Sequence, residues 1–301
     1  MSPKKTKEPK FVSGGRTCAG CGIPLLVNNI LSQTEYPVVS IATGCLEVTS
    51  TIYPYNAWNV PCIHNAFENA AATIAGSEAA FNYKLKKGEL TEDQKKIKFI
   101  AFAGDGGAYD IGLQAISGAF ERGHNFTMVV YDNEGYQNTG GQRSGATPLG
   151  TITTTTPTGK KEKRKNLTEI LVAHGSPYVA QAAIHNLPDL QKKAKKAIET
   201  EGPTALIILM PCPTIWGFLP SKTIEISKLA FETCFWPLYE VENGRYTINS
   251  KPNEKKNIEE FLKLQKRFEP LLKNLEIISD IQKTTDKEWK KLLALEKQNK
   301  N

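Results

Sequence analysis

The chain has 301 residues, of which 40% are hydrophobic and 23% charged, a composition typical of folded globular proteins rather than disordered ones. No apolar run approaches the roughly eighteen residues of a membrane span, and the first ten residues lack the apolar stretch of a secretion signal, so we expect a cytoplasmic protein. The net charge is +7, and the positive charge is concentrated in residues 1–10, 160–165 and 251–301. They do not show basic residues interleaved with aromatic ones on one face, so we expect no nucleic-acid and no membrane partner. We interpret them as solvated tails and a solvated loop, with a steering surface for an acidic partner as the alternative.

Apolar periodicity predicts an α/β fold with a mostly parallel sheet flanked by helices. In chain order the predicted elements are strands at 37–41, 97–103, 126–131 and 205–210, helices at 65–83, 111–122, 167–172 and 187–200, and amphipathic helix from 257 onward. Residues 134–166 show almost no periodicity and predict a long loop, of the kind that is usually functional or disordered. We therefore predict a flexible arm over 1–14, one α/β domain over 15–250 and a helical C-terminal extension over 251–301.

One motif points to a bound diphosphate. Gly104-Asp105-Gly106 follows a predicted strand, and Asn133 follows the next one. Neighbouring parallel strands bring such side chains to one edge of a sheet, where their oxygens suit Mg²⁺. Glycines at the start of the following helix let backbone N–H groups approach a phosphate. The spacing therefore predicts a diphosphate held through Mg²⁺, and it resembles the thiamine-diphosphate motif.

A second pattern consists of four cysteines. Cys18 and Cys21 form a C-x-x-C pair, while Cys45 and Cys212 each follow a predicted strand. Four thiolates suit either a [4Fe–4S] cluster or a tetrahedral zinc ion, and the spacing alone leaves both open. We expect the four thiols to gather at the same sheet edge as the diphosphate.

Six ordered motifs make the sequence recognisable over about residues 15–240. They are Cys18-Ala-Gly-Cys-Gly22, Ala42-Thr-Gly-Cys45, Ile63-His-Asn-Ala-Phe-Glu-Asn69, Gly104-Asp-Gly-Gly-Ala-Tyr-Asp-Ile-Gly112, Asn138-Thr-Gly-Gly-Gln142 and Pro211-Cys-Pro-Thr-Ile-Trp216. Together they resemble the β subunit of pyruvate:ferredoxin oxidoreductase, or of a relative among the 2-oxoacid:ferredoxin oxidoreductases.

The resemblance implies a thiamine-diphosphate-binding fold with defined site residues. Asp105 and Asn133 would bind Mg²⁺ through their side chains, and Gly135 through its backbone carbonyl. Asn138 and Thr139 would lie in the loop that faces the thiazolium and the substrate, as the catalytic candidates. The remaining implied groups are the diphosphate contacts Gly104, Gly106 and Gly107, the cofactor-bordering Gly44 and Cys45, and the [4Fe–4S] ligands Cys18, Cys21, Cys45 and Cys212.

The implied reaction is thiamine-dependent oxidative decarboxylation of a 2-oxoacid to acyl-coenzyme A and CO₂, with electrons passing through the cluster to ferredoxin. A carboxylate for the aminopyrimidine ring would come from a partner α subunit, with γ- and δ-type subunits completing the enzyme. Pyruvate is the first-choice substrate. Ile215 replaces an expected glycine, so branched-chain 2-oxoacids, 2-oxoglutarate and oxalate stay open.

Two other classes compete with this interpretation. One is a cluster-free thiamine decarboxylase or synthase with incidental cysteines, and the other is a non-catalytic zinc-binding scaffold. Iron together with thiamine, thiamine alone, or zinc alone in the purified protein would distinguish the three.

Overall fold

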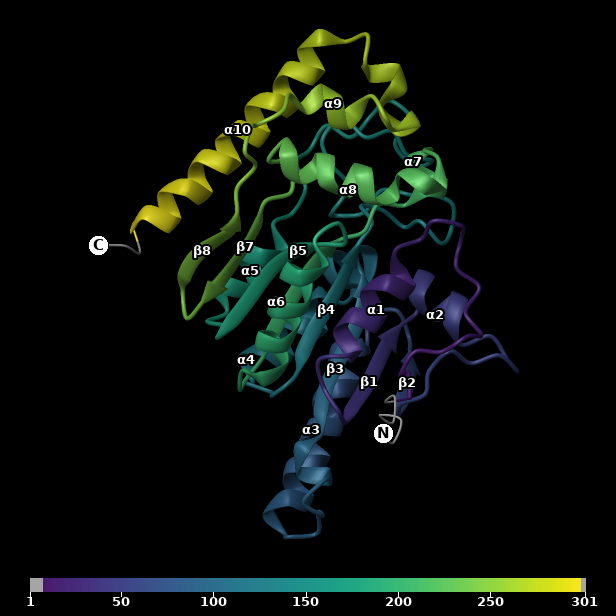
Figure 1. Cartoon of the computed structure of the whole chain (residues 1–301), viewed down its shortest axis with the longest axis vertical. Coiled ribbons are helices and arrows are strands. Elements are labelled where there is room, and N and C mark those ends of the chain that lie inside the picture. The colour runs from purple at the N-terminus through teal and green to yellow at the C-terminus, as the bar shows by residue number, and fades with distance from the viewer. Residues whose placement is uncertain (1–7, 299–301) are drawn as a thin grey trace, which may run out of the picture.

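The computed structural model describes residues 8–298, which form an eight-stranded sheet with helices on both faces (Figure 1). The strands β1 to β6 run parallel, while β7 is antiparallel to both of its neighbours. Across the sheet the order is β2 (Cys62–Asn65), β1 (Pro37–Ala42), β3 (Lys98–Gly104), β4 (Thr127–Asp132), β6 (Thr204–Leu209), β5 (Tyr178–Ala183), β7 (Leu238–Glu242) and β8 (Arg245–Ser250).

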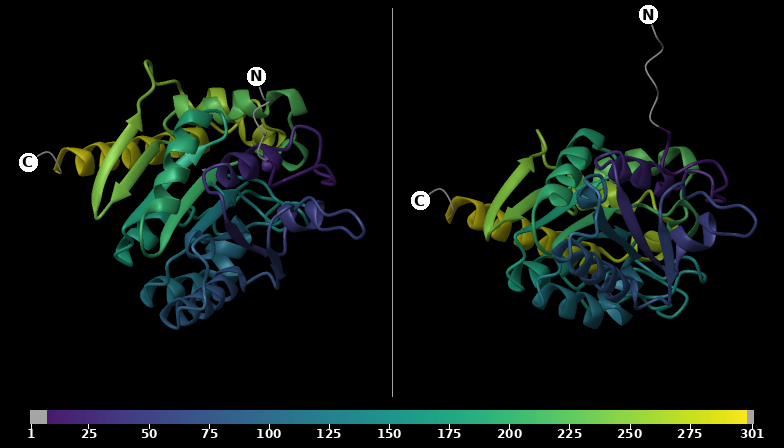
Figure 2. Two further views of the ribbon diagram at one scale, coloured as in Figure 1. Left: turned by 60° about the horizontal axis from the view of Figure 1, so that its bottom comes forward. Right: turned by 90° about the horizontal axis from the view of Figure 1, so that it is seen from below.

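Alternating side chains of the buried strands feed two separate apolar layers. Met128 and Val130 of β4 face one layer, whereas Val129 and Tyr131 face the other. The first layer is covered by α3 (Ala70–Lys86), α4 (Leu113–Glu121) and α5 (Leu167–Ala173), and the second by α1 (Ile23–Leu31), the short α2 (Cys45–Ser50) and α6 (Leu187–Glu199). Figure 2 shows these helices on opposite sides of the sheet.

The C-terminal part packs into the same core. Phe261 and Phe268, both from beyond residue 250, belong to one buried cluster with Trp216. The helices of this part of the chain are α7 (Pro213–Trp216), α8 (Thr223–Glu232), α9 (Ile258–Leu262), the 3₁₀ turn η4 (Lys266–Leu271) and α10 (Leu275–Gln298). The long α10 lies beside β8, where Leu292 packs against the β7–β8 hairpin (Figure 1).

The predicted strands and the long loop are present, with small shifts of their ends. The prediction of one helix over 65–83 is wrong at its start, because 62–65 form the edge strand β2 and the helix begins at Ala70. The Asn65 amide fixes this strand end by donating to Ser40 Oγ at 2.6 Å. Residues 134–166 contain only turns and isolated bridges, as predicted.

The N-terminal arm is described only in part. Residues 1–7 of the predicted arm lie outside the described residues, while Phe11 is buried and packs edge-on against Trp58 at 5.1 Å. Within residues 8–298, none of the helices combines the length and the apolar composition that crossing a bilayer would require.

Candidate functional site

The predicted ligands follow four strands that are direct neighbours in the sheet. Cys45 follows β1, Asp105 follows β3, Asn133 follows β4, and Cys212 lies shortly after β6. The pairing runs β1–β3–β4–β6 and is parallel throughout. The prediction that Asp105 and Asn133 follow neighbouring parallel strands is thereby confirmed, and the carboxyl ends of these strands form the edge at which ligands of open α/β sheets bind.

Asp105, Asn133 and the Gly135 carbonyl come together at the ends of β3 and β4. The Asn133 amide donates from its nitrogen to Asp105 Oδ1 at 2.7 Å and to the backbone oxygen of Gly135 at 3.0 Å. Asp105 is fully buried and Asn133 is 3% exposed. Asn133 thus connects the other two groups that the resemblance implies as Mg²⁺ ligands.

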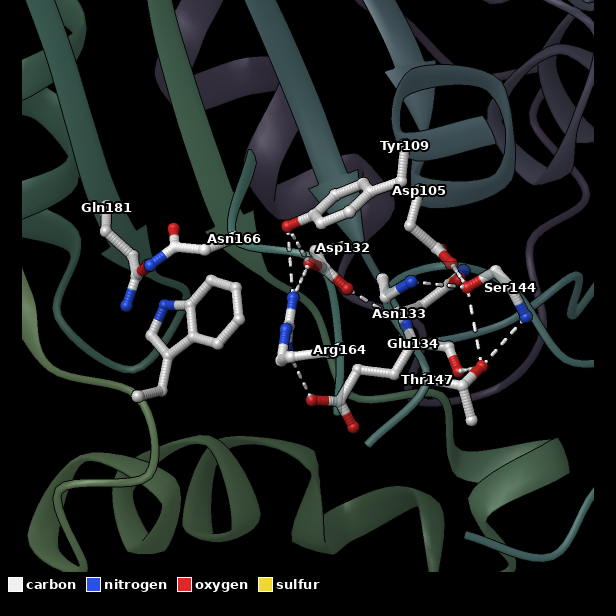
Figure 3. A network of polar contacts seen from close by, with 12 residues as sticks. Asp105, Tyr109, Asp132, Asn133, Glu134, Ser144, Thr147, Arg164, Asn166 and Gln181 are labelled. Carbon is white, nitrogen blue, oxygen red and sulfur yellow. Dashed lines mark hydrogen bonds and ion pairs between the residues drawn. The ribbon is translucent and has the colours of Figure 1, made fainter. Parts of the chain in front are cut away.

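The long loop 134–166 folds back onto this group (Figure 3). The Ser144 hydroxyl donates to Asp105 Oδ2, and the Thr147 hydroxyl donates to the backbone oxygen of Glu134 at 2.9 Å. Burial, followed by the charge of Asp132, raises the pKa of Asp105 well above its usual range, and the bond from Ser144 opposes this rise. The loop therefore encloses the buried carboxylate rather than leaving the sheet edge open.

The glycine-rich turn after β3 is packed so closely that its glycine positions leave no space for a side chain. Residues Gly106–Ile111 form one wide π-helical turn, closed by a bond from Gly112 N to Gly107 O at 2.9 Å. A Cβ on Gly106 would lie 2.5 Å from the Tyr136 ring. The predicted diphosphate contacts Gly104, Gly106 and Gly107 thus begin a buried turn between β3 and α4.

Directly beside Asn133 lies a buried network of opposite charges. Arg164 donates to Asp132 and, at 3.0 Å, to Glu134 Oε1, while Arg267 donates to Glu134 Oε2 at 2.6 Å. Tyr109 donates to Asp132 Oδ2 at 2.6 Å (Figure 3). Burial raises the pKa of Glu134, against the influence of both arginines. Glu134 also has a φ of 61°, a left-handed conformation that costs energy in a non-glycine residue, so these contacts hold a strained residue next to Asn133.

This network corrects the interpretation of 160–165 as a solvated loop. Lys160 is 2% exposed and its ammonium donates to Thr147 O at 2.5 Å, and burial lowers its pKa to about 8. Arg164 also points inward, since the buried carboxylates of Asp132 and Glu134 require a cation. Only the other residues of the run are exposed.

The four cysteines predicted to act together are free thiols within mutual electrostatic reach. Cys18 is exposed, and Cys21, Cys45 and Cys212 are half-buried. Burial raises the pKa of Cys45 to about 12, with further contributions from the charges of Cys212, Cys21, Asp105 and Cys18. Burial likewise raises the pKa of Cys21 to about 11, and Cys212 and Cys18 add to this rise. Across residues 8–298, no three His, Cys, Asp or Glu side chains are arranged to hold a metal ion.

The turn that carries Cys18 and Cys21 is fixed against the segment after β6. Cys21 N donates to Cys18 O at 3.0 Å, and Thr223 Oγ1 donates to Gly20 O at 2.7 Å. Gly20 has a φ of 73°, and a Cβ at this position would lie 2.3 Å from the backbone oxygen of Pro220. This close approach brings the C-x-x-C pair to the chain that follows Cys212.

Two predicted catalytic residues lie apart from the buried group. Asn138 and Thr139 are exposed at the start of the long loop. The Thr139 hydroxyl donates to Gln142 Oε1 at 2.6 Å. The structure thus places them on an accessible turn.

The sequence patterns did not predict the residues that contact the site from distant parts of the chain. Ser144 and Thr147 lie in a loop without periodicity, Arg164 lies within a basic run, and Arg267 lies in a segment without any motif. Only Glu134 had a usable signal, because it directly follows the predicted ligand Asn133. Its two arginine partners are 30 and 133 residues away in the chain, beyond any local pattern.

Comparisons with known proteins identify the family of the chain. A family model described as the C-terminal TPP-binding domain of thiamine pyrophosphate enzymes matches residues 42–208. The chain is 50% identical to pyruvate synthase subunit PorB of Thermotoga maritima, over 98% of this chain and 94% of the relative. It is 48% identical to the PorB subunit of Methanocaldococcus jannaschii (95% and 97% covered) and 43% identical to ketoisovalerate oxidoreductase subunit VorB of Pyrococcus abyssi (96% and 94%).

A solved structure shows the same arrangement of elements. It is the 2-oxoglutarate:ferredoxin oxidoreductase from Magnetococcus marinus with 2-oxoglutarate, coenzyme A and succinyl-CoA bound. The similarity has a TM-score of 0.57 at 25% sequence identity and covers 70% of this chain and 71% of that chain. The chain therefore belongs to the thiamine pyrophosphate enzymes, and within them to the β subunits of the 2-oxoacid:ferredoxin oxidoreductases.

Proposed function

We propose that the chain is the β subunit of a pyruvate:ferredoxin oxidoreductase, which holds thiamine diphosphate, Mg²⁺ and one [4Fe–4S] cluster. The observation that carries the proposal is the meeting of Asp105, Asn133 and Gly135 at the sheet edge where Cys45 and Cys212 follow neighbouring strands, with Cys18 and Cys21 in electrostatic reach of both. The higher identity to two pyruvate synthase subunits, 50% and 48% against 43% for the VorB relative, favours pyruvate over a branched-chain acid.

The chemistry of the three groups supports Mg²⁺, which takes carboxylate and carbonyl oxygens as ligands. The Asn133 amide lies 2.7 Å from Asp105 Oδ1 and 3.0 Å from the Gly135 oxygen, and a half-turn of this amide would present its oxygen to a cation in place of its nitrogen. Asp105, Asn133 and the Gly135 carbonyl would therefore hold the cation, and Ser144 would orient the Asp105 carboxylate.

The redox chemistry named for the relatives favours a cluster over zinc. Zinc has no redox chemistry, whereas a [4Fe–4S] cluster held by four cysteine thiolates transfers electrons. Two relatives are named as an oxidoreductase subunit and a 2-oxoglutarate:ferredoxin oxidoreductase, and the four cysteines of this chain interact electrostatically. These observations speak against the zinc-scaffold alternative.

The residues of this chain have distinct tasks in the proposed reaction. Thiamine diphosphate, when bound, would supply the carbanion chemistry that releases CO₂ from a 2-oxoacid, and a cluster on the four cysteines would supply one-electron transfer. The turn at Gly104–Gly107 would hold the diphosphate, while Glu134 and its arginines hold the Asn133 loop in place. Asn138 and Thr139 would contact the substrate from the accessible loop.

The enzyme needs partner chains, with ferredoxin as electron acceptor and coenzyme A as acyl acceptor. The similar subunit names imply further subunits, and a bound coenzyme A is part of the related structure. We propose that the α subunit supplies the carboxylate for the aminopyrimidine ring. The purified chain with thiamine diphosphate and Mg²⁺ is then expected to turn over no 2-oxoacid, and measurable turnover would contradict this division of the site.

The deciding experiment measures iron, sulfide and thiamine in the anaerobically purified complex of all subunits. We expect about four irons assignable to this chain and one thiamine, with the irons lost in Cys45→Ala. Cys62→Ala is the matched control, since Cys62 is a half-buried free thiol without charge coupling to the four cysteines. Thiamine without iron would favour the cluster-free enzyme. Faster turnover of a branched-chain 2-oxoacid than of pyruvate would overturn the assignment of pyruvate as the substrate.

A further inference from the structure

Arg267 brings a buried positive charge from the C-terminal segment into the site. It lies in η4 and its side chain is 3% exposed. Its Nη2 donates to Glu134 Oε2 at 2.6 Å, and its Nε donates to Gln265 Oε1 at 2.9 Å. Burial of a guanidinium is costly without such partners, so the position of this charge is fixed by the fold.

The guanidinium lies over the short helix that begins after Cys212. Arg267 stacks on Trp216 with its central carbon 3.6 Å from the ring centroid. Trp216 N donates to Cys212 O at 3.0 Å, and the indole N–H donates to Asn133 O at 2.9 Å. Trp216 thus connects Arg267 to the last of the four cysteines and to the proposed Mg²⁺ loop.

One edge of the guanidinium has no protein partner. Within residues 8–298, Arg267 Nη1 is buried and donates to no acceptor. A buried donor left unpaired costs free energy, so an acceptor that the protein chain does not provide is expected at this place.

We infer that Arg267 raises the reduction potential of the [4Fe–4S] cluster by holding a positive charge beside Cys212. The inference rests on the proposed function, since it assumes the cluster on the four cysteines. Reduction of a cluster by one electron adds one negative charge, and a nearby cation stabilises that reduced form. Arg267 is on this account a positioning and tuning residue that contacts neither the substrate nor the reacting atoms.

The test is a redox titration of the anaerobic, iron-loaded complex, followed by the EPR signal of the reduced cluster. Arg267→Gln is expected to shift the midpoint potential of this cluster to a more negative value, whereas Arg267→Lys keeps the charge and restores most of the shift. Lys263→Gln removes the same charge from an exposed position in the same segment and is expected to leave the midpoint unchanged. An unchanged midpoint in an iron-loaded Arg267→Gln complex would overturn the inference.

A second variant covers the case in which Arg267→Gln does not assemble. Glu134→Gln removes the negative partner of the same ion pair, and the midpoint should then move to a more positive value. A general structural disturbance would not shift the midpoint potential in opposite directions in Arg267→Gln and Glu134→Gln. An unchanged or more negative midpoint potential in Glu134→Gln would contradict the inference. Absence of iron from the wild-type complex would instead refute the cluster and the proposed function itself.

Discussion

Asp105 is the residue on which the proposed Mg²⁺ site depends most. Asp105→Asn keeps the shape of the side chain but removes the charge that faces Asn133 and Gly135. Bound thiamine and turnover of the complex are expected to fall at least about 100-fold, which exceeds the usual loss from a supporting residue. Asp93→Asn, at an exposed carboxylate paired with Lys96, is the control and should change neither. Full thiamine occupancy in Asp105→Asn would place the cation elsewhere.

His185 makes stability depend on pH. Burial lowers its pKa from 6.5 to about 4, and the ring lies beside Phe231 and the hydroxyl of Ser227. Between these two values the unfolded chain binds a proton that the folded chain does not, so the free energy of unfolding falls as the pH drops through this window.

The measurement is the melting temperature of the complex between about pH 7 and pH 4, where His185→Gln should weaken the dependence. A variant with the same slope as the wild type would show that other groups cause it. Above the ordinary pKa the His185 ring is neutral in both the folded and the unfolded chain. In that range we expect the wild type and His185→Gln to show the same dependence of melting temperature on pH.

The turn that presents Cys18 and Cys21 tolerates no side chain at its glycine. Gly20→Ala would force a Cβ against the backbone of Pro220, so the turn would move away from Cys212 and the iron content of the complex should fall. Gly88→Ala is matched, because Gly88 also has a positive φ, of 69°, but open space around it. It should cost about 1 kcal/mol and leave the iron in place. Equal iron content in the two variants would show that cluster binding does not depend on the position of this turn.

The strands β3, β4 and β6 were predictable because continuous apolar runs mark strands buried on both faces. Strand β5 was not predicted, because its alanines pack equally well in a helix. Only its pairing with β6 shows that the segment is a strand. The β7–β8 hairpin did carry a signal in Asn243-Gly244, both at positive φ, which the periodicity did not capture.

The same limit applies to the candidate site. Residues that end a strand, such as Asp105 and Asn133, could be predicted from the strand itself. The two arginines that pair with the adjacent Glu134 could not, because an ion pair across 30 or 133 residues depends on how the whole chain folds.

For the whole molecule, the C-terminal segment decides whether the site forms. A chain ending at residue 250 lacks Arg267, Phe261 and Phe268, and each lost phenylalanine alone removes about 3–5 kcal/mol. This loss is comparable to the entire stability of a domain, so no thiamine-bound complex is expected. A chain ending at residue 273 keeps all three residues and should bind thiamine, with a lower melting temperature because α10 is missing.

Co-expression of each truncated chain with the partner subunits, followed by thiamine analysis and thermal melting, measures the difference. A complex of the 1–250 chain with full thiamine would show that residues 15–250 fold alone, as the predicted domain boundary at 250 allows. Failure of both truncations would make α10 itself part of the folding unit.

The buried network beside Asn133 contains two carboxylates, Asp132 and Glu134, and two guanidiniums, Arg164 and Arg267. Loss of any one leaves a buried charge uncompensated, at a cost of about 3–5 kcal/mol. Natural selection would remove most single replacements, so these positions should change in descent as complementary pairs. A relative with a neutral residue in place of Arg267 should also have a neutral residue in place of Glu134. The intermediate with only one of the two replacements would be unstable and therefore short-lived in evolution.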